Sequence, residues 1–302
     1  MHTYSNPGTY TVTLTVTDSA GDSASTQTTV TTAGSDYTAF GPTRVLDTRS
    51  GLGATKARVA PGKAVRVQIG GYDGIPTGVT AAVVNITATD GTGAGVLTAY
   101  PDGESKPTAS NVNYGGGQNI ANAAVIPVGS DGKIDIANAM TGKTGGTDVI
   151  VDVVGYYSTS GASAYVPVEP HRYLDTRAAY WQDGPLYAGA DNYFGLPIGL
   201  ADNGTDESDV TGFVVNATVT NTTANGVLTD GPDPNTQAAY DNGTDINPTP
   251  PTASSLNWLK GQTVPNLVQV STGSTGIVDF WNLGSSGSAA LILDVFGFYQ
   301  ND

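Results

Sequence analysis

Cysteine is absent from this chain of 302 residues, and histidine occurs only twice. Without cysteine, neither disulfide bonds nor zinc–thiolate sites can form. A Ser-His-Asp triad would have to use His171 as its base, and no Gly-x-Ser-x-Gly nucleophile elbow accompanies that residue. Paired carboxylates for glycoside hydrolysis stay open, because acidic residues are numerous. We nevertheless predict that the chain is not an enzyme, with a glycoside or peptide hydrolase as the least favoured function.

Positive charge is also scarce, with 12 Lys and Arg against 27 Asp and Glu and a net charge of −15. Nucleic acids are bound through clustered Lys and Arg, so we expect no nucleic-acid partner. No run of 18 apolar residues occurs, so we expect no membrane insertion. An acidic surface keeps a protein soluble by self-repulsion, which fits a secreted, extracellular protein.

The chain is instead rich in threonine and glycine, and charged residues make up only 13%. Such a composition favours short strands joined by tight turns over long helices. Strand-like runs recur every 8 to 15 residues, separated by Gly, Pro, Asn and Asp. This spacing is typical of a β-sandwich or barrel. We therefore predict an all-β fold.

The N-terminal segment has the pattern of a β-hairpin. In residues 9–17, Tyr, Val and Leu alternate with threonine, and a turn over residues 18–22 leads to a second Thr- and Val-rich run over residues 23–32. Residues 1–34 resemble the C-terminal half of a PKD domain, an immunoglobulin-like extracellular module. Two strands alone are marginal in water. We expect the hairpin to pack on the following domain or to pair with another copy of the chain.

The rest of the chain contains the same set of motifs twice, in the same order. The second copy carries an insertion near residues 234–250. These repeats predict one domain over residues 37–159 and a second over residues 164–302. The matching segments are residues 44–49 and 172–177 (Arg-x-Leu-Asp-Thr-Arg), 83–89 and 214–220, 95–98 and 226–229, 107–110 and 251–254 (Pro-Thr-Ala-Ser), and 152–157 and 294–299.

These motifs resemble a repeat of secreted actinobacterial cell-surface proteins, where it is often appended to amidases, peptidases and PKD modules. The resemblance implies a secreted accessory domain and no particular activity. Together with the patterns above, it predicts two homologous β-sandwich domains in tandem, preceded by a partial immunoglobulin-like (PKD) hairpin. After Arg177 the second copy departs from the pattern, since Ala-Ala-Tyr-Trp replaces the Gly-rich turn.

The Leu-Asp-Thr-Arg motif has a structural and a functional interpretation. Asp152 and Asp294 are lone acids within strongly apolar strands, where an unpaired carboxylate would be costly. We predict that Arg49 pairs with Asp152 and that Arg177 pairs with Asp294, joining the first and last strands of each domain. In the alternative interpretation, the motif binds a polar ligand.

We predict no cofactor, with calcium as the one candidate, since acidic turns bind it in extracellular β-modules. No run matches an EF-hand loop, and Asn-Gly and Asp-Gly are turn formers in any case. The alternative is therefore a set of solvated turns. The candidate metal ligands, all in the second copy, are Asp202, Asp206, Asp209, Asp241 and Asp245.

Aromatic residues cluster in the second copy, where Tyr180 and Trp181 lie in a loop-like segment with Tyr187 nearby. Exposed aromatic rings stack on the apolar faces of sugars. These three residues are the candidate ligand-binding site, with packing inside the domain as the alternative. We predict a non-catalytic extracellular accessory region that contacts cell-surface or environmental polysaccharide. The alternative function is a structural stalk or a fibre-forming protein that assembles by edge-strand pairing.

Overall fold

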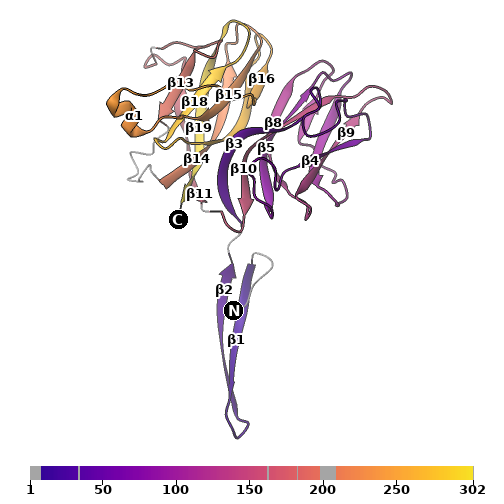
Figure 1. Cartoon of the computed structure of the whole chain (residues 1–302), viewed down its shortest axis with the longest axis vertical. Coiled ribbons are helices and arrows are strands. Elements are labelled where there is room, and N and C mark those ends of the chain that lie inside the picture. The colour runs from indigo at the N-terminus through magenta and orange to yellow at the C-terminus, as the bar shows by residue number, and fades with distance from the viewer. Residues whose placement is uncertain (1–7, 33–34, 162, 182, 198–208, 302) are drawn as a thin grey trace.

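The computed structural model describes residues 8–32, 35–161, 163–181, 183–197 and 209–301 (Figure 1). The predicted all-β fold is confirmed, because one six-residue helix accompanies the strands within this part of the chain. No helix there is long and apolar enough to cross a membrane. The hairpin and the first sandwich contain β1 Gly8–Thr17, β2 Ser23–Thr32, β3 Asp36–Asp47, β4 Ala64–Gln68, β5 Ala81–Thr89, β6 Gly95–Pro101, β7 Val112–Tyr114, β8 Ile120–Pro127, β9 Lys133–Met140 and β10 Asp148–Ser158.

The second sandwich follows directly and has the same order of strands, with one additional short strand and the helix. It contains β11 Ser163–Asp175, β12 Leu186–Tyr187, β13 Tyr193–Pro197, β14 Val210–Thr220, β15 Gly226–Pro232, α1 Gln237–Asn242, β16 Leu256–Trp258, β17 Val264–Ser271, β18 Ile277–Asn282 and β19 Ser288–Asn301.

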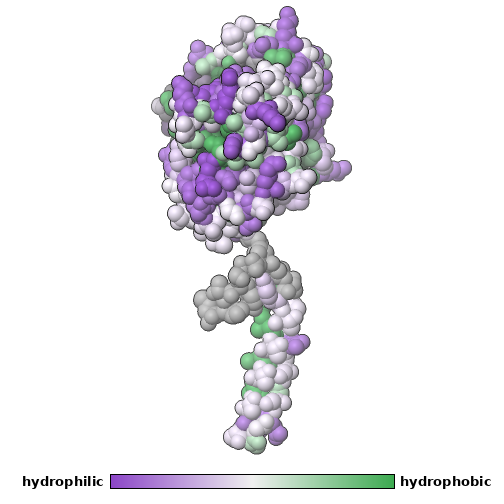
Figure 2. Space-filling view, turned by 90° about the vertical axis from the view of Figure 1, so that its right-hand side faces the viewer, coloured by the Kyte–Doolittle hydropathy of each residue, from purple (hydrophilic) through white to green (hydrophobic). Residues whose placement is uncertain are grey.

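The N-terminal strands β1 and β2 form an antiparallel two-stranded sheet that projects away from the body (Figure 1). Leu14 and Val16 are each 61% exposed, and Figure 2 shows apolar residues on the surface of this hairpin. The expected packing on the following domain is therefore not observed. Threonine and serine side chains bond across the strands, for example Thr15 to Ser25 at 2.7 Å. Such cross-strand pairs stabilise the hairpin locally.

Each sandwich packs a large antiparallel sheet against a smaller one. In the first sandwich the sheets are β3-β10-β5-β8 and β4-β9-β6-β7, and in the second they are β11-β19-β14-β17 and β13-β18-β15-β16. The two small sheets thus have corresponding strand orders. Alternation along the strands directs one face of each sheet into a core of Val, Ile, Leu and aromatic side chains.

The two large sheets join edge to edge through β3 and β11, which pair at Tyr37 and Ser163. The rings of Tyr37 and Tyr299 stack there with centroids 3.7 Å apart, and the Tyr157 and Tyr299 hydroxyl groups lie 2.7 Å apart. Gly155 makes room for this contact, since a Cβ atom there would lie 2.3 Å from the Tyr37 ring. The sandwiches are therefore packed together by aromatic side chains at the junction.

The insertion of the second copy contains α1. Thr236 caps the start of this helix through its side chain, which accepts a hydrogen bond from the Ala239 amide. Gly243 ends the helix in the left-handed conformation, with φ of 64°. The insertion returns to β16 through the Pro-Thr-Ala-Ser segment of residues 251–254, and this return places that segment against the first sandwich.

Candidate functional site

The buried acid of each large sheet is paired with an arginine, but not with the arginine that the sequence predicted. Arg44 forms a bidentate pair with Asp152, with Nε–Oδ1 at 2.8 Å and Nη2–Oδ2 at 3.2 Å. The predicted Arg49–Asp152 pair is therefore wrong. The reason is register, because Arg44 lies directly opposite Asp152 on the neighbouring strand, whereas Arg49 follows the end of β3.

The same correction applies to the second copy. Arg172 binds Asp294 with the same two distances, 2.8 and 3.2 Å, so the predicted Arg177–Asp294 pair is also wrong. Arg177 instead folds back onto Asp175, and its hydrogen bonds lower the pKa of that carboxyl group to about 2. The two arginines of the motif thus have different partners. Arg172 binds the acid on the neighbouring strand, and Arg177 binds the acid of its own turn.

In the first copy, Arg49 folds back in the same way and binds Asp47, with Nη2–Oδ2 at 2.8 Å. Arg44 also approaches Asp47, at 3.5 Å. Burial favours the neutral carboxyl group, but the bonds from Arg49 outweigh it and lower the pKa of Asp47. The Arg49 side chain is 42% exposed and lines a cavity, so it remains accessible to a ligand.

The two sandwiches meet where residues 251–254 lie against the first large sheet. Nη2 of Arg44 donates to the carbonyl oxygen of Thr252 at 2.6 Å, and the Ser254 amide donates to Asp152 at 3.4 Å. Asn85 also donates to the carbonyl oxygen of Ser254, and the Thr87 and Ser254 hydroxyl groups lie 3.3 Å apart. The Pro-Thr-Ala-Ser motif of the second copy is therefore held by residues of the first copy that belong to its repeated motifs.

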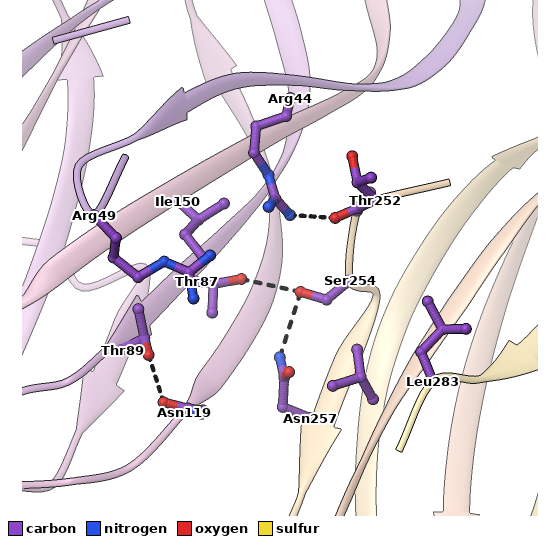
Figure 3. Close-up of a pocket in the computed structure, with 12 residues that line it drawn as sticks. Arg44, Arg49, Thr87, Thr89, Asn119, Ile150, Thr252, Ser254, Asn257 and Leu283 are labelled. Carbon is purple, nitrogen blue, oxygen red and sulfur yellow. Dashed lines mark hydrogen bonds between the residues drawn. The ribbon is translucent and has the colours of Figure 1, made fainter. Parts of the chain in front are cut away.

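A cavity of about 260 Å³ lies beside this contact (Figure 3). One wall comes from the first copy, with Arg49, Thr89 and Asn119, and the other from the second copy, with Asn257 and its apolar neighbours. The Thr89 hydroxyl group is already bonded to Asn119, at 2.5 Å. The cavity presents a cation, amides and hydroxyl groups beside apolar surface. This mixture suits a small polar ligand.

The three aromatic residues of the predicted ligand-binding site differ in their exposure. Tyr180 is 66% exposed and Tyr187 is 54% exposed, while Trp181 is partly buried. The Trp181 ring packs edge-on against Phe194 with centroids 5.1 Å apart, and its Nε1 donates to the carbonyl oxygen of Gly184. Trp181 therefore anchors the turn, and the two tyrosines are the rings available for stacking.

The predicted calcium ligands do not form a described cluster. Asp202 and Asp206 lie outside the described residues, whereas Asp209, Asp241 and Asp245 are exposed. Within the described ranges, no group of three or more acidic or histidine side chains is arranged to hold a metal ion. Calcium binding therefore stays a prediction.

A different pair of acids was absent from the sequence prediction and consists of Asp279 in β18 and Asp233 directly after β15. Asp279 is fully buried and neither of its carboxyl oxygens has a hydrogen-bond partner in the described structure. Burial, and then the charge of Asp233, raise the pKa of Asp279 to about 7. The corresponding acid of the first copy, Asp135, is instead paired with Arg66, whose position in the second copy is taken by Gly195.

His171 does not form a catalytic arrangement in the described structure. Its Nδ1 lies 3.0 Å from the carbonyl oxygen of Glu169, two residues earlier, on an exposed stretch of β11. The sequence patterns did not identify Arg44, Arg172 and the Pro-Thr-Ala-Ser segments as contact residues. The Pro-Thr-Ala-Ser segments could have been found from the sequence, because they recur in both copies but lack the apolar alternation of a buried strand. A polar loop that recurs without contributing to a core is a candidate for a contact at the surface.

Comparison with known proteins identifies part of this architecture. The PKD domain family matches residues 1–33, which confirms the resemblance of the N-terminal hairpin. No curated protein matches the chain.

Two solved structures with carbohydrate-binding modules are distantly similar. The first is the M60 catalytic domain with the CBM51-1 and CBM51-2 domains of Clostridium perfringens ZmpB, at 8% identity and TM-score 0.19, with 99% of this chain and 42% of that chain covered. The second is the CBM22-1–CBM22-2 tandem domain of Paenibacillus barcinonensis Xyn10C, at 10% identity and TM-score 0.22, with 86% and 98% covered. The chain thus spans less than half of the first structure. At these TM-scores neither likeness identifies a ligand.

Proposed function

We propose that this chain is a non-catalytic accessory region of a secreted cell-surface protein and that it binds polysaccharide. The observation that carries this proposal is the pair of exposed tyrosines, Tyr180 and Tyr187, beside a turn anchored by Trp181. A tyrosine side chain has few rotatable bonds, so it loses little conformational freedom when a sugar stacks on its ring. The resemblance of the repeats to actinobacterial cell-surface modules supports the same location.

The cavity between the sandwiches is the second feature that supports a polysaccharide ligand. Arg49 is held in place by Asp47, so its exposed guanidinium group is ordered before any ligand arrives. A guanidinium group binds carboxylates with two parallel hydrogen bonds, which favours a sugar that carries an acidic group. Asn119 and Asn257 add amide groups suited to sugar hydroxyl groups.

The test is a pull-down on insoluble polysaccharides and purified bacterial cell walls. We expect retention of the full chain on at least one polymer and a loss of affinity of roughly tenfold or more when Tyr180→Ala and Tyr187→Ala are combined. The matched control is Ile246→Ala, which removes an apolar side chain that is 63% exposed elsewhere on the second copy. Equal retention of the double variant and the control would contradict the proposed site, and retention on no polymer would contradict the function.

A second candidate function is assembly through the N-terminal hairpin. The specific observation in its favour is the apolar row Val12, Leu14 and Val16, which is between 37% and 61% exposed on strands with open edges. A second copy of the hairpin could add a strand to such an edge and place its own apolar row beside this one. Leu14→Lys should then abolish self-association measured by light scattering, without changing the circular dichroism of the body.

A further inference from the structure

The contact between the two sandwiches uses motifs that both copies possess. The contact has two sides, a docking loop and a docking surface. In the observed contact, the docking loop is residues 251–254 of the second copy. The docking surface on the first copy consists of Arg44, Asn85, Thr87 and Asp152.

The second copy carries the same docking surface at the corresponding strand positions. Asp294 lies between Arg172 and Asn216 on the neighbouring strands, as Asp152 lies between Arg44 and Asn85. The residue types are identical, and Thr218 follows Asn216 by two positions as Thr87 follows Asn85. The residues of this second docking surface are Arg172, Asn216, Thr218 and Asp294.

This second docking surface is formed but uncovered. The Arg172 and Asp294 side chains are 48% and 24% exposed, against 17% and 0% for Arg44 and Asp152 beneath the docking loop. Asn216 donates instead to Thr218, at 3.2 Å, so its amide group is turned to a local partner. The bidentate Arg172–Asp294 pair has the geometry of the covered pair. No rearrangement of that pair is required before a loop can dock.

The first copy likewise carries a docking loop with nothing bound to it. Residues 107–110 are exposed, whereas Ala253 and Ser254 are buried at 6% and 8% exposure. The free loop is braced as the docked one is, since Asn122 donates to the carbonyl oxygen of Asn111 at 2.8 Å and Asn266 donates to that of Ser255 at 2.6 Å. Each chain thus presents one free loop and one free surface of a contact already made inside the chain.

We propose that the docking loop of the first copy, residues 107–110, binds the docking surface of the second copy in a neighbouring molecule of the same chain. The observed contact joins two different surfaces, so its repetition between molecules is head-to-tail. Such an association continues into a filament or closes into a ring, depending on the rotation per step. This surface is separate from the tyrosine pair and from the hairpin, so the proposal does not rest on either proposed function.

The test measures mass by size-exclusion chromatography with light scattering, over a range of about 1 µM to about 1 mM. The upper limit matches the effective concentration of tethered domains, which is on the order of millimolar. We expect the mass of the full chain to rise with concentration from 30.7 kDa to roughly twice that value or more. A mass that stays at 30.7 kDa across the range would overturn the proposal.

Two variants block one side each. Ala109→Trp enlarges an exposed loop residue whose docked counterpart, Ala253, is buried. Thr218→Trp fills the free docking surface, at the position where Thr87 contacts Ser254. Each variant alone should stay monomeric, and a mixture of the two should form only dimers, since each retains the side that the other lacks.

The hairpin variant Leu14→Lys is the control that separates this contact from hairpin pairing. It should still form the head-to-tail assembly, so that any mass it loses is limited to what hairpin pairing contributes. If Leu14→Lys abolished assembly while Ala109→Trp and Thr218→Trp had no effect, the hairpin would be the interface and the proposal would be wrong. If the mixture of the two blocked variants stayed monomeric, the head-to-tail contact would likewise be refuted.

Discussion

Removing Arg44 should destabilise the protein far more than removing its counterpart Arg172. Asp152 is fully buried and is bonded by two nitrogens of Arg44. In the Arg44→Ala variant this carboxylate keeps only the long bond from the Ser254 amide, at 3.4 Å. Loss of one partner of a buried ion pair costs about 3–5 kcal/mol, because the other charge stays buried and uncompensated.

The Arg172→Ala variant is the matched control, since it removes the same side chain from the same motif. Arg172 and Asp294 are 48% and 24% exposed, so water can solvate the carboxylate that remains. Exposed pairs of this kind contribute about 0–1 kcal/mol. The two variants should therefore differ by about 3 kcal/mol in the free energy of unfolding.

Urea unfolding followed by two probes measures this difference. Trp181, Trp258 and Trp281 all belong to the second sandwich, so tryptophan fluorescence reports on that sandwich. Far-ultraviolet circular dichroism reports on both sandwiches. Because Arg44 also bonds Thr252, its loss should weaken the contact between the sandwiches and separate the two transitions. Equal destabilisation by the two substitutions would refute the role assigned to Arg44.

Three further results are expected. The folded-state pKa of Asp279, about 7, lies above its ordinary value of 3.8, so its contribution to stability is present below pH 4 and is lost as the pH rises to 7. Asp279→Asn should therefore raise the free energy of unfolding at pH 8 by up to about 4 kcal/mol relative to the unmodified chain, and not at pH 4, which thermal melting at the two pH values measures. Asp135→Asn, which breaks the exposed pair with Arg66, should give no such gain in the same melting experiment. Gly155→Ala should lower the urea midpoint, because its Cβ would lie 2.3 Å from the Tyr37 ring at the junction, and an unchanged midpoint would contradict that packing.

Local features of the sequence were enough to predict the fold class. The alternation of Val, Ile and Thr, the scarcity of charge and the frequent turn residues all favour strands, and each acts over a few residues. The internal repeat predicted two homologous sandwiches, because two segments with the same motifs in the same order are expected to adopt the same fold. The lone acids Asp152 and Asp294 were correctly expected to require a partner, since burial of an unpaired charge is costly in any fold.

The choice of partner was decided by the tertiary structure. Arg44 and Arg49 are five residues apart and chemically alike, so only the register of β3 against β10 could assign Asp152 to one of them. The burial of the Trp181 ring depends in the same way on its contact with Phe194, which lies on a separate strand.

The contact between the copies was also beyond the reach of the sequence. The two Pro-Thr-Ala-Ser segments have the same residues, yet residues 251–254 are docked and residues 107–110 are free. Which of the two segments is docked depends on how the second sandwich is placed on the first, through the junction of β3 with β11. The sequence by itself determined the strands, their repeat and the need to neutralise buried acids. The register and the packing of one copy on the other, which depend on long-range contacts, determined which side chains meet.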